Sequence, residues 1–184
     1  MSAAVEGGDG ERLGRRVGYD GKKIRVNVDH IRLPNGHEMQ FELIRHPGAA
    51  AVVPILPGGE VVMVRQYRYA AGGWLLEIPA GTLDGDESPE SCALREIEEE
   101  IGYRAGHLEP LGWIWSSPGF CDERIWLYLA TDLTPCRQGL EHDEVLTVET
   151  MLLAEAVDQA ARGEIVDSKS TAALLRAARH LELG

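Results

Sequence analysis

The chain has 184 residues, 44% of them hydrophobic, and a formal net charge of −12. This size and composition fit one domain with an appendage, and the lack of any block of Lys or Arg argues against a nucleic-acid partner. Its three cysteines form no CxxC pair, which disfavours a disulfide framework or a zinc site. No signal-like segment opens the chain and no apolar run reaches about 18 residues, so we expect a soluble cytoplasmic protein with no membrane partner.

The N-terminal part predicts a tail followed by a small β appendage. Residues 1–18 are rich in Gly and charge, and we expect a flexible tail there. Within residues 19–47, the alternating runs IRVNVDHIRL and EMQFELIR flank Pro34-Asn35-Gly36, a pattern typical of antiparallel strands joined by a tight turn. The appendage either covers one end of the core or takes part in dimerisation and substrate contact.

Residues 48–184 predict a larger mixed α/β domain. The runs AAAVVPIL, VVMVRQYRY, LLEIPAG, GWIWSS, RIWLYLATDL and VLTVETML favour strands. Helices are expected at residues 154–162 and 170–181, besides the one described next. Several strands and three helices without regular βαβ alternation indicate a mixed sheet with helices packed against it.

Residues 81–103, GTLDGDESPESCALREIEEEIGY, predict a helix with many carboxylates. Ser88 is a good N-cap, Pro89 suits the first helical position and Gly102 can close the far end, so the helix is expected over residues 89–101. At about 100° per residue, one face carries apolar side chains and another carries Glu96, Glu99 and Glu100.

The acidic face of this helix predicts a metal site. Glu96 and Glu100 are four residues apart, a spacing at which like charges destabilise a helix, so a positive group is expected between them. Arg95 can orient Glu99 but cannot neutralise three carboxylates. Clustered oxygen ligands suit Mg²⁺ or Mn²⁺. The alternative is an ordinary solvated acidic face.

The spacing around the helix resembles a known family. Gly81, five residues, Glu87, seven residues and then REIEEEIGY match every fixed position of the Nudix box. The flanking stretches VRQYRYA, EIPAG, SSPGFCDE and IVDSKS are similar to the ADP-ribose pyrophosphatase branch of that family, and Pro118 matches a proline about fifteen residues beyond the box. The resemblance covers residues 19–182, and it implies a Nudix-type α/β/α sandwich with a mixed β-sheet and a homodimer.

The resemblance also implies which residues hold metal. Two or three Mg²⁺ ions, or Mn²⁺ or another divalent cation, would be held by the following residues: the Ala80 carbonyl, Glu96, Glu99, Glu100 and Glu144. Gly81, Arg95 and Gly102 would support the box structurally. The general base stays open between Glu144, Glu141, His142 and a box glutamate, Glu99 or Glu100, because His142 stands where the family commonly has a first glutamate.

Substrate contacts are implied in the same way. Arg65 and Arg68 are expected on one face of a strand, with Arg68 as the phosphate or ribose contact. Gly119 lies in a loop that can approach the ligand, and Glu123 would accept hydrogen bonds from the terminal ribose. The adenine would lie between subunits against Phe41 and Arg45.

The activity implied is metal-dependent hydrolysis of the diphosphate of ADP-ribose, giving AMP and ribose 5-phosphate. One alternative is the same chemistry on another nucleoside diphosphate compound, such as GDP-mannose, NADH or FAD. Another is a sensor that binds ADP-ribose without cleaving it. Such modules usually lose box carboxylates, whereas Glu96, Glu99 and Glu100 are all present here.

Overall fold

The computed structural model describes residues 9–21, 24–140, 142 and 144–181. They fall into two compact units. Unit 1 comprises Met1–His46 and Ser117–Glu123, and unit 2 comprises Pro47–Ser116 and Arg124–Gly184. The predicted appendage therefore includes a segment from the middle of the chain.

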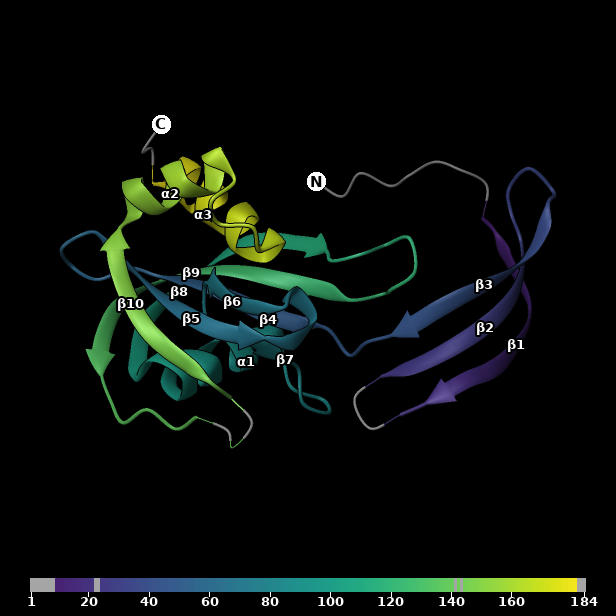
Figure 1. Cartoon of the computed structure of the whole chain (residues 1–184), viewed down its shortest axis with the longest axis horizontal. Helices are drawn as coiled ribbons and strands as arrows, with labels where there is room; N and C mark the ends of the chain where they lie inside the picture. The colour runs from purple at the N-terminus through teal and green to yellow at the C-terminus, as the bar shows by residue number, and fades with distance from the viewer. Residues whose placement is uncertain (1–8, 22–23, 141, 143, 182–184) are drawn as a thin grey trace. The chain divides into compact units, whose positions relative to one another are not determined.

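Unit 1 is an antiparallel sheet of β1 (Glu11–Asp20), β2 (Arg25–Arg32) and β3 (Glu38–Arg45), in that order (Figure 1). The backbone of Ile44 exchanges hydrogen bonds of 2.8 and 3.1 Å with Phe120 and Asp122, which ties the Ser117–Glu123 segment to β3.

The flexible tail predicted for residues 1–18 is wrong for residues 11–18, which belong to β1. Composition suggested disorder, but two of the charged side chains of β1, Glu11 and Arg15, have partners on β2. Arg15 donates two hydrogen bonds of 2.6 Å to Asp29, and Arg32 donates one of 2.7 Å to Glu11. These cross-strand pairs could not be predicted from the sequence of residues 11–18 alone, because the partners lie on another strand.

Unit 2 contains two sheets (Figure 1). The first has the order β7-β4-β9-β8, built from β4 (Ala49–Pro54), β7 (Ala80–Thr82), β8 (Tyr103–Trp115) and β9 (Arg124–Pro135). β4 and β9 run parallel and the other pairs antiparallel, so the predicted mixed sheet is confirmed. The second is antiparallel, with the order β10-β5-β6, from β5 (Glu60–Arg68), β6 (Gly73–Glu77) and β10 (Leu146–Leu152). A short 3₁₀ turn, Tyr69–Ala71, joins β5 to β6.

Helices cover both sides of these sheets. α2 (Leu153–Arg162) and α3 (Ser168–His180) pack on one side, and α1 (Pro89–Glu96) on the other (Figure 1). Alternate residues of β4 divide between the two cores: Ala51 and Val53 face α2 and α3, whereas Ala50 and Val52 face α1. The predicted α/β/α sandwich is therefore confirmed. Among the described residues, no helix is long and apolar enough to span a membrane.

The helix of the Nudix box, residues 89–101 and called the box helix below, begins and ends as predicted. The Ser88 hydroxyl accepts from the Ser91 N–H at 3.2 Å, and Gly102 closes the far end at φ 69°. The sequence did not predict that the last turn, Ile97–Ile101, is a π-helical turn. Single π turns inside α-helices frequently mark functional sites.

Candidate active site

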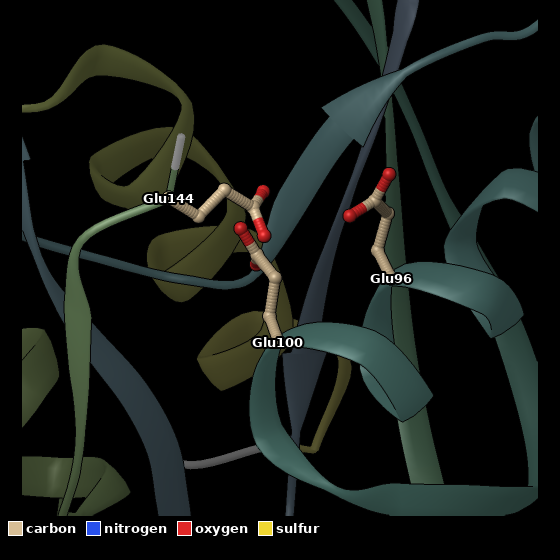
Figure 2. A group of neighbouring side chains, drawn as sticks. All are labelled: Glu96, Glu100 and Glu144. Atoms are coloured by element: carbon tan, nitrogen blue, oxygen red, sulfur yellow. The ribbon is translucent and has the colours of Figure 1, made fainter. Parts of the chain in front are cut away.

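Three carboxylates from two distant parts of the chain lie together in unit 2. Glu96 and Glu100 project from the box helix, and Glu144 precedes β10 (Figure 2). One carboxylate oxygen from each lies within 4.8 Å of the others, and their side chains point toward one another. The predicted association of Glu144 with the box glutamates is thus present in the structure.

The electrostatics of this group favour a bound cation. Glu96 and Glu100 are only 5% and 1% exposed. Burial, together with the neighbouring carboxylates, raises the pKa of Glu96 to about 7 and that of Glu100 to about 8. Ionising both near neutral pH therefore needs compensating positive charge. Three carboxylate oxygens at this separation are a donor set that Mg²⁺ or Mn²⁺ accepts, so the residues fit a divalent ion.

The backbone at the start of the box holds two of these side chains in place. The Ala80 N–H donates to Glu100 Oε2 at 2.9 Å. Gly81 lies against Glu96 so closely that a Cβ on Gly81 would overlap the Glu96 carboxylate. The glycine of the box is therefore required by the close approach of Glu96, which agrees with its predicted structural role.

Arg95 contacts several box carboxylates, including Glu99, the one residue that it was expected to orient. Its guanidinium donates to Glu96 Oε1 at 2.6 Å, to Glu99 Oε2 at 2.9 Å and to both oxygens of Glu87. Glu99 is about one-third exposed and lies outside the group of three. Glu98 pairs with the exposed Arg104 at 3.2 Å. The helix thus directs Glu96 and Glu100 inward, while Arg95 holds Glu99 beside them.

Arg65 and Arg68 were predicted to share one face of a strand, and this prediction is wrong. They are three residues apart on β5, and side chains alternate along a strand, so they point to opposite sides. Arg65 pairs with Glu149 on β10, whereas Arg68 donates hydrogen bonds of 2.9 and 2.8 Å to Glu77.

Glu77 is a residue whose role the sequence did not predict. It is 1% exposed and also accepts a hydrogen bond from Lys169. Burial alone would raise the pKa of Glu77, but Arg68 and Lys169 outweigh burial and lower it. The similarity of EIPAG and IVDSKS to the family was the available signal, although it assigned no role to Glu77 or Lys169.

The other predicted substrate residues lie in unit 1. Phe41 is partly buried on β3, Arg45 pairs with Asp122 at 2.6 Å, and Glu123 lies 3.6 Å from His46. Gly119 is exposed. Their contribution to substrate binding remains a prediction.

Of the remaining base candidates, His142 is exposed and Glu141 lies outside the described residues.

Comparison with known proteins agrees with this geometry. The model of the NUDIX domain family matches residues 45–174. The methanol dehydrogenase activator of Bacillus methanolicus is 40% identical over 158 residues, covering 85% of each chain. The ADP-ribose pyrophosphatase of Bacillus subtilis (strain 168) is 37% identical, again over 158 residues and 85% of each chain. A solved structure described as an ADP compounds hydrolase superposes with a TM-score of 0.84 over 94% of each chain, and at 22% identity it shows a shared fold. The chain therefore belongs to the Nudix hydrolase family.

Proposed function

We propose that this protein is a metal-dependent pyrophosphatase that hydrolyses ADP-ribose to AMP and ribose 5-phosphate. The observation that carries the chemistry is the buried group of Glu96, Glu100 and Glu144 beside the glycine of the box. The ADP-ribose pyrophosphatase of Bacillus subtilis, 37% identical over most of both chains, supports the choice of substrate.

Two or three Mg²⁺ or Mn²⁺ ions would be held by the Ala80 carbonyl, Glu96 and Glu100, with Glu99 and Glu144 contributing. When bound, these ions supply positive charge that neutralises the diphosphate, and they make a water molecule more acidic. The burial of Glu96 and Glu100 supports this assignment, because it raises the pKa of Glu96 to about 7 and that of Glu100 to about 8, and a bound cation would favour their ionised forms. Glu99 is more exposed and is held by Arg95, which suits a secondary role.

Glu144 is the described residue best suited to remove a proton from the attacking water. It is less buried than Glu96 and Glu100, and its carboxylate faces theirs (Figure 2). Water attacks one phosphorus, the bridging P–O bond breaks, and the second phosphate leaves with the bridging oxygen. Arg68, fixed by Glu77, is suited to contact a phosphate or ribose oxygen.

The remaining parts of the proposal come from the family resemblance and the composition. The adenine would bind against Phe41 and Arg45 at the interface of a homodimer, and Gly119 and Glu123 would contact the terminal ribose. The absence of a CxxC pair supports a cytoplasmic location.

Product analysis tests this proposal. The purified chain is incubated with ADP-ribose, GDP-mannose, NADH or FAD, with and without Mg²⁺. We expect AMP and ribose 5-phosphate, formed only with metal and fastest from ADP-ribose. Faster cleavage of another compound would overturn the substrate assignment, and metal-dependent binding of ADP-ribose without any product would indicate a sensor instead.

Substitution of a buried box glutamate tests the site. Glu100→Gln should lower kcat by a factor of about 10² or more without loss of the fold, because the substitution removes a charged ligand of the metal ion. Glu98→Gln is the matched control, because Glu98 belongs to an exposed pair with Arg104 and its loss should change activity by less than about twofold. Near-full activity of Glu100→Gln, with its circular dichroism unchanged, would contradict the assignment of this ligand.

A further inference from the structure

The N-terminus of α3 is fastened to the segment between β6 and β7. Asp167 caps α3 by accepting from the Ser170 N–H at 2.9 Å. The Ser170 hydroxyl also donates to Asp167 and accepts from the Ile78 N–H at 2.9 Å. Ser170 is fully buried. One buried hydroxyl therefore joins the helix cap to the segment that leads into the box.

Lys169 makes a second connection at the same place. Its ammonium lies between Glu77 Oε2 and Asp167 Oδ2, the latter at 3.1 Å. The side chains are 12% exposed for Lys169, 2% for Glu77 and 15% for Asp167. Arg68 holds Glu77 through both carboxylate oxygens. Two cations and two carboxylates thus form one network in which Lys169 is shared by both acids, and Arg68, with 39% of its side chain exposed, is the member that reaches solvent.

This network is continuous with the group of three carboxylates. Glu77 and Ile78 are followed by Pro79, whose carbonyl accepts from the Val52 N–H at 3.0 Å, and by Ala80, whose N–H donates to Glu100. The segment from Glu77 to Ala80 is therefore held by α3 at one end and supports Glu100 at the other. Displacement of the first end would be transmitted over three peptide bonds.

We propose that Lys169 is a positioning residue that, together with Asp167 and Ser170, fixes the Glu77–Ala80 segment and Arg68 so that Glu100 keeps its place for the metal ion. Lys169 acts through Glu77 and not on the substrate. The catalytic part of this inference rests on the proposed function, whereas the metal-binding part does not.

Loss of the Lys169 ammonium has a definite physical consequence. Glu77 would lose one hydrogen-bond donor in a buried place and would face Asp167 without the cation between them. Leaving a buried charge without its partner is costly, so the segment would shift to reach water or to separate the two acids. A displacement of about 1 Å at a site can lower turnover by a factor of about 10².

The experiment compares Lys169→Met, Lys169→Arg and Arg162→Met in the full-length protein. Arg162→Met is the matched control because it also removes one positive charge, from an exposed pair with Glu164. The measurements are Mn²⁺ affinity by electron paramagnetic resonance, and kcat and KM for the best diphosphate substrate. We expect Lys169→Met to weaken Mn²⁺ binding about tenfold and to lower kcat 10–100-fold. Lys169→Arg should restore most of both, and Arg162→Met should match the wild type.

A Lys169→Met variant with wild-type Mn²⁺ affinity would overturn the inference. If that variant does not fold, the single variant Glu77→Gln is compared with the double variant Glu77→Gln/Lys169→Met instead. In both of them residue 77 carries no charge, so loss of Lys169 leaves no unpaired carboxylate at that position. The two should then bind Mn²⁺ equally, and a further loss in the double variant would contradict action through Glu77. If the wild type cleaves no diphosphate, the proposed function fails, while the Mn²⁺ affinities still decide the role of Lys169.

Discussion

Replacement of Gly81 by Ala tests how tightly the site is built. A Cβ at this position would overlap Oε1 and Cδ of Glu96 and would stand 2.7 Å from Oε2. Non-bonded heavy atoms prefer separations of about 3.5–4.0 Å, so the carboxylate would have to move by on the order of 1 Å or more. Glu96 cannot move freely, because its side chain is 7% exposed and accepts a hydrogen bond of 2.6 Å from Arg95.

The expected loss follows from that displacement. A misplacement of about 1 Å lowers turnover by a factor of about 10², which corresponds to about 2.7 kcal/mol of transition-state stabilisation. The assay measures kcat/KM for ADP-ribose, Mn²⁺ affinity and thermal unfolding of Gly81→Ala. Gly73→Ala serves as the control, because a Cβ there meets no atom within 4 Å. Activity of Gly81→Ala within twofold of the control would refute the claim that this glycine sets the position of Glu96.

Three further predictions concern charge. Metal affinity should rise with pH between about 6 and 8.5, because protons compete for Glu96 and Glu100, whose pKa values are raised to about 7 and about 8. By the same linkage the metal-free protein should be more stable near pH 6 than near pH 8.5, because the folded state binds protons that the unfolded state has already released. Thermal unfolding of Glu100→Gln should show a smaller change in stability over this pH range. Arg68→Lys should lower kcat/KM by about tenfold or more because an ammonium cannot make the paired contact with Glu77, whereas Arg65→Lys, in an exposed pair, should change it by less than about threefold in the same assay.

The sequence predicted the box helix well because the signals are local. A helix cap depends on residues within one turn, so Ser88 and Gly102 set its two ends. The start of α3 was placed two residues too late, since Asp167 itself caps the helix and Ser168 is already helical. The inward direction of Glu96 and Glu100 also follows from helical spacing, as does the separate position of Glu98.

Features that depend on pairing between distant segments were harder to predict. β1 forms because Arg15 and Glu11 meet partners on β2, and the Ser117–Glu123 segment joins unit 1 through the backbone of Ile44. Neither contact can be predicted from the sequence of one segment alone. The role of Glu77 was missed for the same reason, since its partner Lys169 is 92 residues away.

The charge arrangement around the box explains why a divalent ion, and not a side chain, should complete the site. The two guanidinium groups described nearby cannot balance the group of three: Arg95 is shared by Glu87, Glu96 and Glu99, and so compensates Glu96 only in part, while Arg68 is held by Glu77. Glu100 accepts a neutral backbone N–H, which cannot balance its charge. The group of three therefore retains negative charge in a buried place, and small, doubly charged ions relieve it most effectively. Such ions also bind phosphate oxygens. A metal ion held by these carboxylates can therefore bridge them to an anionic diphosphate, although the chain has a net charge of −12.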